Sequence, residues 1–75
     1  MNSSVIKKAK EAIKENFEKL EKLEKEKQEL IQRYKMASEN EKSEIEEKMK
    51  ASEQCFKKLA EDTEKLRKKI SNLKN

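Results

Sequence analysis

Apolar residues recur along the chain at alternating spacings of three and four residues, which is the spacing of the a and d positions in a heptad repeat. One run occupies positions 6, 9, 13, 16, 20, 23, 27, 30 and 34, and a second occupies positions 45, 49, 52, 56, 59, 63, 66, 70 and 73. Of these 18 positions 14 are apolar, against 10 of the other 57. Neither run shows the alternation of a β-strand, so the pattern predicts two amphipathic helices.

A largely polar segment over residues 37–44 separates the two runs. Ser43 and Glu46 have the spacing of a capping box, in which each side chain bonds a free backbone amide at the start of a helix. Asn40 suits the left-handed conformation that often follows the end of a helix. We therefore predict that residues 1–75 form a single coiled-coil element, with a helix over about 4–37, a turn over about 38–43 and a helix over about 44–74.

Folding the chain back at this segment aligns the two runs in antiparallel register, so that the residue numbers at facing positions add to 79. The four polar exceptions then pair with each other, Asn16 with Thr63 and Lys27 with Ser52, and no polar group faces a purely apolar partner. The sequence therefore predicts an all-α fold, an antiparallel two-helix coiled-coil hairpin. Its predicted apolar seam consists of Ile6, Ala9, Ile13, Leu20, Leu23, Leu30, Tyr34, Ile45, Met49, Phe56, Leu59, Leu66, Ile70 and Leu73.

A continuous parallel coiled-coil rod is the alternative arrangement. The last position of the first run and the first position of the second are 11 residues apart, about three helical turns, which would keep the apolar stripe on one face without a turn. The flanking charges also favour the rod, because most of its interchain pairs attract, whereas Lys10 with Arg67 and Glu24 with Glu53 repel in the hairpin. Exposed pairs of this kind contribute only about 0.3–0.5 kcal/mol each. The matched polar positions therefore make the hairpin the preferred prediction.

The composition indicates that the predicted hairpin needs a partner to be stable. The chain contains no Gly and no Pro, the residues that most often interrupt helices. With 75 residues, of which 48% are charged and 4% are aromatic, it has too little apolar material to enclose a core alone. We expect a face that docks on protein helices, from a second copy or from another subunit, in a homo- or hetero-oligomer. Apolar residues flank the seam at the e positions Phe17, Ile31 and Ala60, which form the candidate partner face, and at the g positions Val5, Ala12 and Cys55.

The chain lacks the residues from which most active sites are built. It has no His, no Trp, no Gly-rich phosphate loop and no Cys-x-x-Cys pair, and it carries no motif of a known family. We therefore expect a protein that is not an enzyme and that binds neither a cofactor nor a metal. The single Cys55 cannot form an intrachain disulfide, and no stretch of about 18 apolar residues occurs. These features favour a cytoplasmic or nuclear location and no transmembrane segment.

Positive charge is concentrated near the C-terminus. Residues 1–56 contain 13 basic and 13 acidic side chains, whereas residues 57–75 contain seven basic and three acidic side chains. A basic helical module that binds an acidic polymer such as nucleic acid is therefore the alternative function. No aromatic residue is interleaved with these cations, so we expect a coiled-coil scaffold or assembly subunit rather than a nucleic-acid-binding protein. The candidate anion-binding residues are Lys65, Arg67, Lys68 and Lys69.

Overall fold

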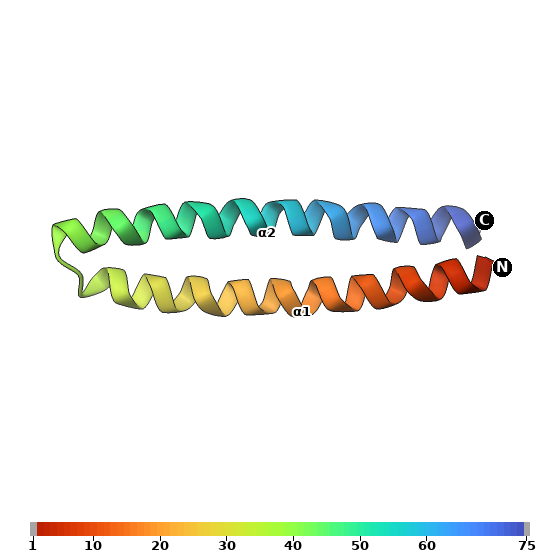
Figure 1. Ribbon diagram of the computed structural model, residues 1–75, viewed down its shortest axis with the longest axis horizontal. Helices are drawn as coiled ribbons and strands as arrows, with labels where there is room; N and C mark the ends of the chain where they lie inside the picture. The colour runs from red at the N-terminus through yellow and green to blue at the C-terminus, as the bar shows by residue number, and fades with distance from the viewer. Residues whose placement is uncertain (1, 75) are drawn as a thin grey trace.

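The computed structural model describes residues 2–74 and contains two helices, α1 (Asn2–Lys35) and α2 (Glu39–Lys74). The helices contact each other and lie side by side, so that the start of α1 and the end of α2 are at the same end of the molecule (Figure 1). The shape is elongated, with extents of 56 × 15 × 12 Å. The predicted hairpin of two contacting helices is confirmed, and the continuous rod is not the arrangement of this chain. Residues 1 and 75 of the predicted element lie outside the described part.

Both helices are favoured by their local sequence. Lys, Glu, Leu and Gln lose little side-chain freedom in a helix, and no Gly or Pro interrupts the 34 residues of α1 or the 36 residues of α2. Glu39 and Glu41 lie in the first turn of α2, where the helix dipole stabilises negative charge. Arg33 and Lys35 lie in the last turn of α1, where the dipole stabilises positive charge. The charges at both helix ends therefore support a break between residues 35 and 39.

The turn consists of only three residues, Met36, Ala37 and Ser38. At the end of α1 the backbone amides of Met36 and Ala37 donate hydrogen bonds to the carbonyl oxygens three residues earlier, at 3.2 Å and 3.3 Å. Bonds of this tighter kind satisfy carbonyl groups that the end of an α-helix leaves free. The side chain of Met36 is 91% exposed, so the turn itself buries little apolar surface.

Ser38 is the N-cap of α2. Its hydroxyl oxygen accepts a hydrogen bond from the backbone amide of Glu41 at 3.4 Å, and its carbonyl accepts the first helical bond, from the amide of Lys42 at 2.8 Å. This is the pattern of an N-cap residue, whose side chain satisfies one of the amides left free at a helix start. Ser38 and Glu41 also have the S-x-x-E spacing of a capping box.

The prediction of a turn over 38–43, with Ser43 as the cap and Asn40 in a left-handed conformation, was therefore wrong. Asn40 and Ser43 both lie within α2, and no described residue has a positive φ angle. The chain offers two S-x-x-E sequences, and the earlier one begins the helix. Starting at Ser38 lets residues 39–43 join the helical hydrogen-bond ladder, which a start at Ser43 would leave without those bonds.

The contact between α1 and α2 is narrow. Of the 18 positions in the two heptad runs, 17 are buried or half-buried, and the exception is Phe56, which is 39% exposed. Within the described chain the core nevertheless contains only two buried apolar residues, Ala9 at 7% and Ile45 at 3% exposure. Two helices bury one strip of each other and leave the sides of that strip open to solvent.

Candidate interaction surfaces

Thr63 is the most deeply placed polar residue of the seam, with 4% of its surface exposed. Its hydroxyl group donates a hydrogen bond to the carbonyl oxygen of Leu59 at 2.7 Å, one turn earlier in α2. The hydroxyl is thus satisfied within its own helix, which removes most of the cost of burying it. Asn16, its predicted partner in α1, is half-buried, but the burial of Thr63 does not depend on that pairing.

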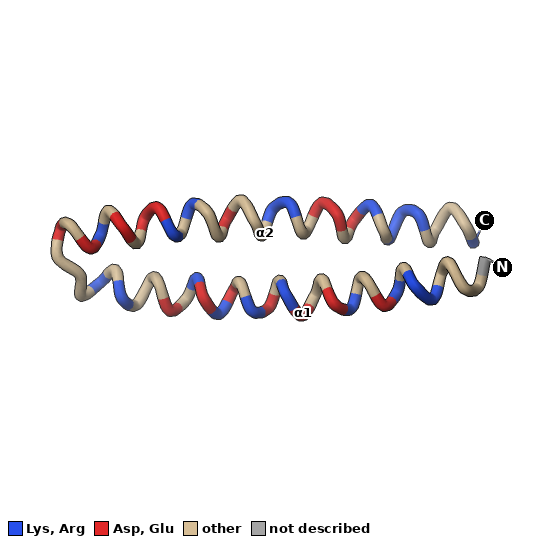
Figure 2. Tube along the Cα trace, in the orientation of Figure 1, with Lys and Arg blue, Asp and Glu red and all other residues tan. Residues whose placement is uncertain are grey.

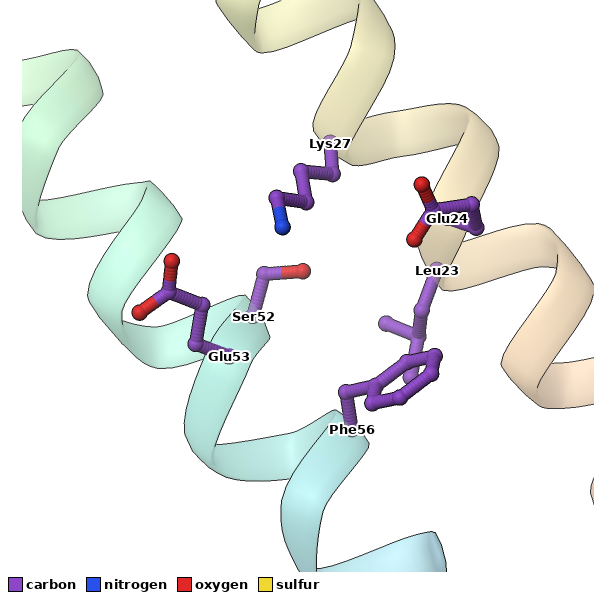
Figure 3. A pocket seen from close by; sticks show the side chains of 6 residues that line it. All are labelled: Leu23, Glu24, Lys27, Ser52, Glu53 and Phe56. Atoms are coloured by element: carbon purple, nitrogen blue, oxygen red, sulfur yellow. The ribbon is translucent and has the colours of Figure 1, made fainter.

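The second polar layer opens into a small pocket on one side of the seam. Lys27 extends from α1 toward Ser52 of α2 (Figure 3). The short side chain of Ser52 leaves a volume of about 100 Å³, beside which the apolar stem of Lys27 can lie while its amine stays near water. The predicted facing pairs Leu23 with Phe56 and Lys27 with Ser52 therefore line one pocket. Its six residues are Leu23, Glu24, Lys27, Ser52, Glu53 and Phe56.

Tyr34 connects the end of α1 to the start of α2. Its hydroxyl group donates a hydrogen bond to the Glu46 carboxylate, with 3.0 Å between the phenolic oxygen and Oε1. The amine of Lys42 lies 5.3 Å from the centre of the Tyr34 ring, within the range of a cation–π contact. The hydrogen bond to Glu46 raises the pKa of the Tyr34 phenol above 10.0, and the negative charge of Glu46, partial burial and the charge of Glu39 add to the effect.

We expect Glu46→Ala to lower the pKa of Tyr34 toward its ordinary value of about 10. The chain has one Tyr and no Trp, so ultraviolet absorbance of tyrosinate reports this residue alone. Because the folded state raises this pKa, the phenol stabilises the hairpin fully below about pH 10, and this stabilisation is lost as the pH rises through the folded value. Glu47→Ala, at the adjacent exposed position, is the control and should leave the titration unchanged. Identical curves for all three proteins would contradict the hydrogen bond.

The predicted register places the e positions of the two helices on one side of the hairpin, which we call the e face. Two pairs on this side lie together in the structure: Glu24 and Glu53 line the pocket of Figure 3, and Ile31 and Glu46 line an open groove of about 360 Å³ with Tyr34, Lys35 and Met49. The described e face consists of Ser3, Lys10, Phe17, Glu24 and Ile31 from α1 and Glu46, Glu53, Ala60, Arg67 and Lys74 from α2.

Phe17 is the most exposed apolar side chain of the e face. It is 51% exposed, although it lies near the middle of α1, whereas Ile31 and Ala60 are half-buried. On the opposite side of the hairpin Val5 is 41% exposed and the free Cys55 is also exposed. The predicted partner face is therefore only partly covered by the hairpin itself, and Phe17 is its most exposed side chain.

Basic residues are frequent at the end where α1 begins and α2 ends, and acidic residues are frequent in the first turns of α2 at the turn end (Figure 2). Lys7, Lys10 and Lys14 line one shallow groove near the start of α1. Arg67 and Lys68 line another near the end of α2. The four candidate anion-binding residues of α2 are all exposed. The fold therefore brings basic residues from opposite ends of the sequence to one end of the molecule.

Comparison of the chain with protein-family models, with curated proteins and with solved structures finds no match. The class is therefore defined by the geometry described above, a two-helix hairpin with a partly uncovered apolar face. Neither helix, over residues 2–74, is long and apolar enough to cross a membrane. In the same part of the chain no group of three or more acidic or thiol side chains is placed to hold a metal ion.

Proposed function

We propose that this chain is a non-enzymatic interaction element, a scaffold or assembly subunit, in which an antiparallel coiled-coil hairpin docks through its e face on helices of a protein partner. The observation that carries the proposal is the exposure of Phe17 at 51% near the middle of α1. A large aromatic side chain contributes most to stability and binding when it is fully buried. The hairpin leaves half of this side chain in water.

The narrow seam supports the same conclusion. Ala9 and Ile45 are the buried apolar residues of the described chain, and the remaining seam residues keep part of their surface in contact with solvent. A single strip of helix contact rarely stabilises so small a protein. Helices of a partner packed on the e face would cover Phe17 and the open sides of the pocket lined by Leu23 and Phe56. Docking would therefore complete the core of the hairpin.

Site-specific photo-crosslinking tests this proposal. A photoreactive phenylalanine analogue at Phe17 should form protein adducts in extracts of the native cell, because this position would lie within the interface. The matched control places the same analogue at Glu18, the neighbouring exposed residue of α1, where we expect at least tenfold less adduct. Equal yields at both positions, or no adduct from Phe17, would refute docking through the e face.

The basic end supports a second candidate function, binding of an acidic polymer. The supporting observation is that the fold places Lys7, Lys10 and Lys14 at the same end as the basic residues of α2 (Figure 2). The two functions differ in their response to salt. Phosphate binding weakens steeply as counterions compete, whereas docking of an apolar face withstands moderate salt. A tight, salt-sensitive complex with nucleic acid would place this candidate above the protein scaffold.

A further inference from the structure

The hairpin exposes far more surface than a compact protein of its size. A folded monomer of 8.9 kDa ordinarily exposes about 4,800 Å², whereas this chain exposes 6312 Å². The excess of roughly 1,500 Å² is larger than the approximately 800 Å² that each partner buries in a standard interface. The hairpin as a whole therefore leaves enough surface uncovered for a stable association with a molecule of similar length.

The charged residues of the e face are segregated by sign. Lys10, Arg67 and Lys74 all lie in the half that carries the termini, and Glu24, Glu46 and Glu53 all lie in the half that carries the turn. The order has no exception among the six charged e positions. The opposite face shows no such order, because acidic and basic residues are mixed in both of its halves. Its charged g positions are Lys19, Glu26, Arg33, Glu41, Lys48, Asp62 and Lys69.

A face that is positive at one end and negative at the other is complementary to itself when it is turned end to end. A two-fold axis at the middle of the face places the positive half of each copy on the negative half of the other. The same axis passes close to Phe17, which lies near the midpoint of α1, so the exposed apolar residues of both copies come together at the centre. Packing in the same direction would instead place Lys10 and Arg67 against their own copies.

We propose that the partner of the e face is a second copy of this chain, packed in the opposite direction to form a four-helix bundle of two hairpins. This inference rests on the proposed function and names its partner. In the bundle the Lys10 and Arg67 pair of each copy meets the acidic half of the other copy, where Glu24, Glu46 and Glu53 lie. Phe17 of both copies is buried at the middle, which gives the hairpin the closed core it lacks alone.

Two charge reversals test the pairing. Lys10→Glu with Arg67→Glu leaves Lys74 as the only basic residue of the described e face, and Glu24→Lys with Glu53→Lys leaves Glu46 as its only acidic residue. Each reversal replaces one like-charge pair within the hairpin by another, so the hairpin itself should remain folded. We expect wild type to sediment at twice its chain mass of 8.9 kDa, and each double variant to dissociate at least tenfold more readily. An equimolar mixture of the two variants should recover the dimer, as should a chain that carries all four substitutions.

The matched control lies on the opposite face. Lys19→Glu with Asp62→Lys exchanges two charges that face each other in the predicted register, and it should leave the dimer unchanged. A wild-type protein that stays at 8.9 kDa at every concentration, double variants with the wild-type mass, or a mixture that does not recover the dimer would each overturn the inference. If the chain is monomeric while Phe17 crosslinks to a different protein, docking through the e face stands and the second copy is excluded.

The direction of packing has its own measurement. A label at Met36→Cys, in a chain whose only cysteine is replaced by Cys55→Ser, marks the turn end of each copy, because Met36 lies in the turn and is 91% exposed. In the proposed bundle the two labels lie at opposite ends of a molecule whose long extent is 56 Å. Labels close together would show packing in the same direction and would overturn the charge argument.

Discussion

Leu20→Asp and Leu59→Asp are each expected to destabilise the hairpin by at least about 2 kcal/mol, enough to lower its helicity sharply. Both leucines are half-buried, and the predicted register places them opposite each other near the middle of the seam. An aspartate at either position removes apolar contacts and brings a carboxylate into a narrow strip that offers it no partner. Circular dichroism during heating and sedimentation would measure the loss of helix and of assembly.

The control places the same residue on the exposed side of each helix. Lys25→Asp in α1 and Glu47→Asp in α2 change exposed positions outside the seam, and we expect a shift of no more than about 0.5 kcal/mol from each. Seam variants that melt like these controls would show that the heptad positions do not form the helix contact.

Labels at Glu11 and Lys68 are expected to lie close together within one chain. These residues flank Ile13 and Leu66, which face each other in the register, and packed helices lie about 8–10 Å apart. The label separation should therefore be comparable with the 15 Å width of the molecule. A continuous helix would separate Ile13 from Leu66 by roughly 80 Å. Spin-label or fluorescence distance measurements distinguish the two values directly.

The labelled chain is diluted in unlabelled chain, so that only the distance within one molecule contributes. Labels at a second pair, Glu11 and Glu47, give a reference distance, because the hairpin predicts that these two residues lie about 30 Å apart along its axis. A distance beyond about 60 Å between Glu11 and Lys68 fits only the extended helix. That result would contradict the hairpin, and with it the e face and the basic end, since both depend on the chain folding back.

The helices and the seam could be predicted from the sequence because heptad spacing is a local property. A helix of 3.6 residues per turn brings every a and d position to one side, wherever the partner helix comes from. Of the 18 positions chosen in this way, 17 are buried or half-buried. The exception, Phe56, is exposed because its neighbouring layer contains Lys27 and Ser52, which leave a pocket beside the ring.

The start of α2 could not be predicted in the same way, since two S-x-x-E sequences are possible helix starts. Ser38 and Ser43 have equivalent capping chemistry, and local propensity does not rank them. The three-residue turn places Tyr34 beside Glu46, where the two form a hydrogen bond of 3.0 Å. That contact joins residues 12 positions apart and exists only after the chain has folded back.

The sequence by itself determined that the chain is helical and which residues lie on the apolar side of each helix, because these depend on neighbours within a few turns. Only the tertiary structure decided between the hairpin and the continuous rod, and it also set the length of the turn. Lys10 and Arg67, or Glu24 and Glu53, are far apart along the chain. Glu24 and Glu53 come to line one pocket when two helices of nearly equal length lie side by side, and the predicted register places Lys10 and Arg67 on the same face. The separation of charge along that face is therefore a property of the folded hairpin.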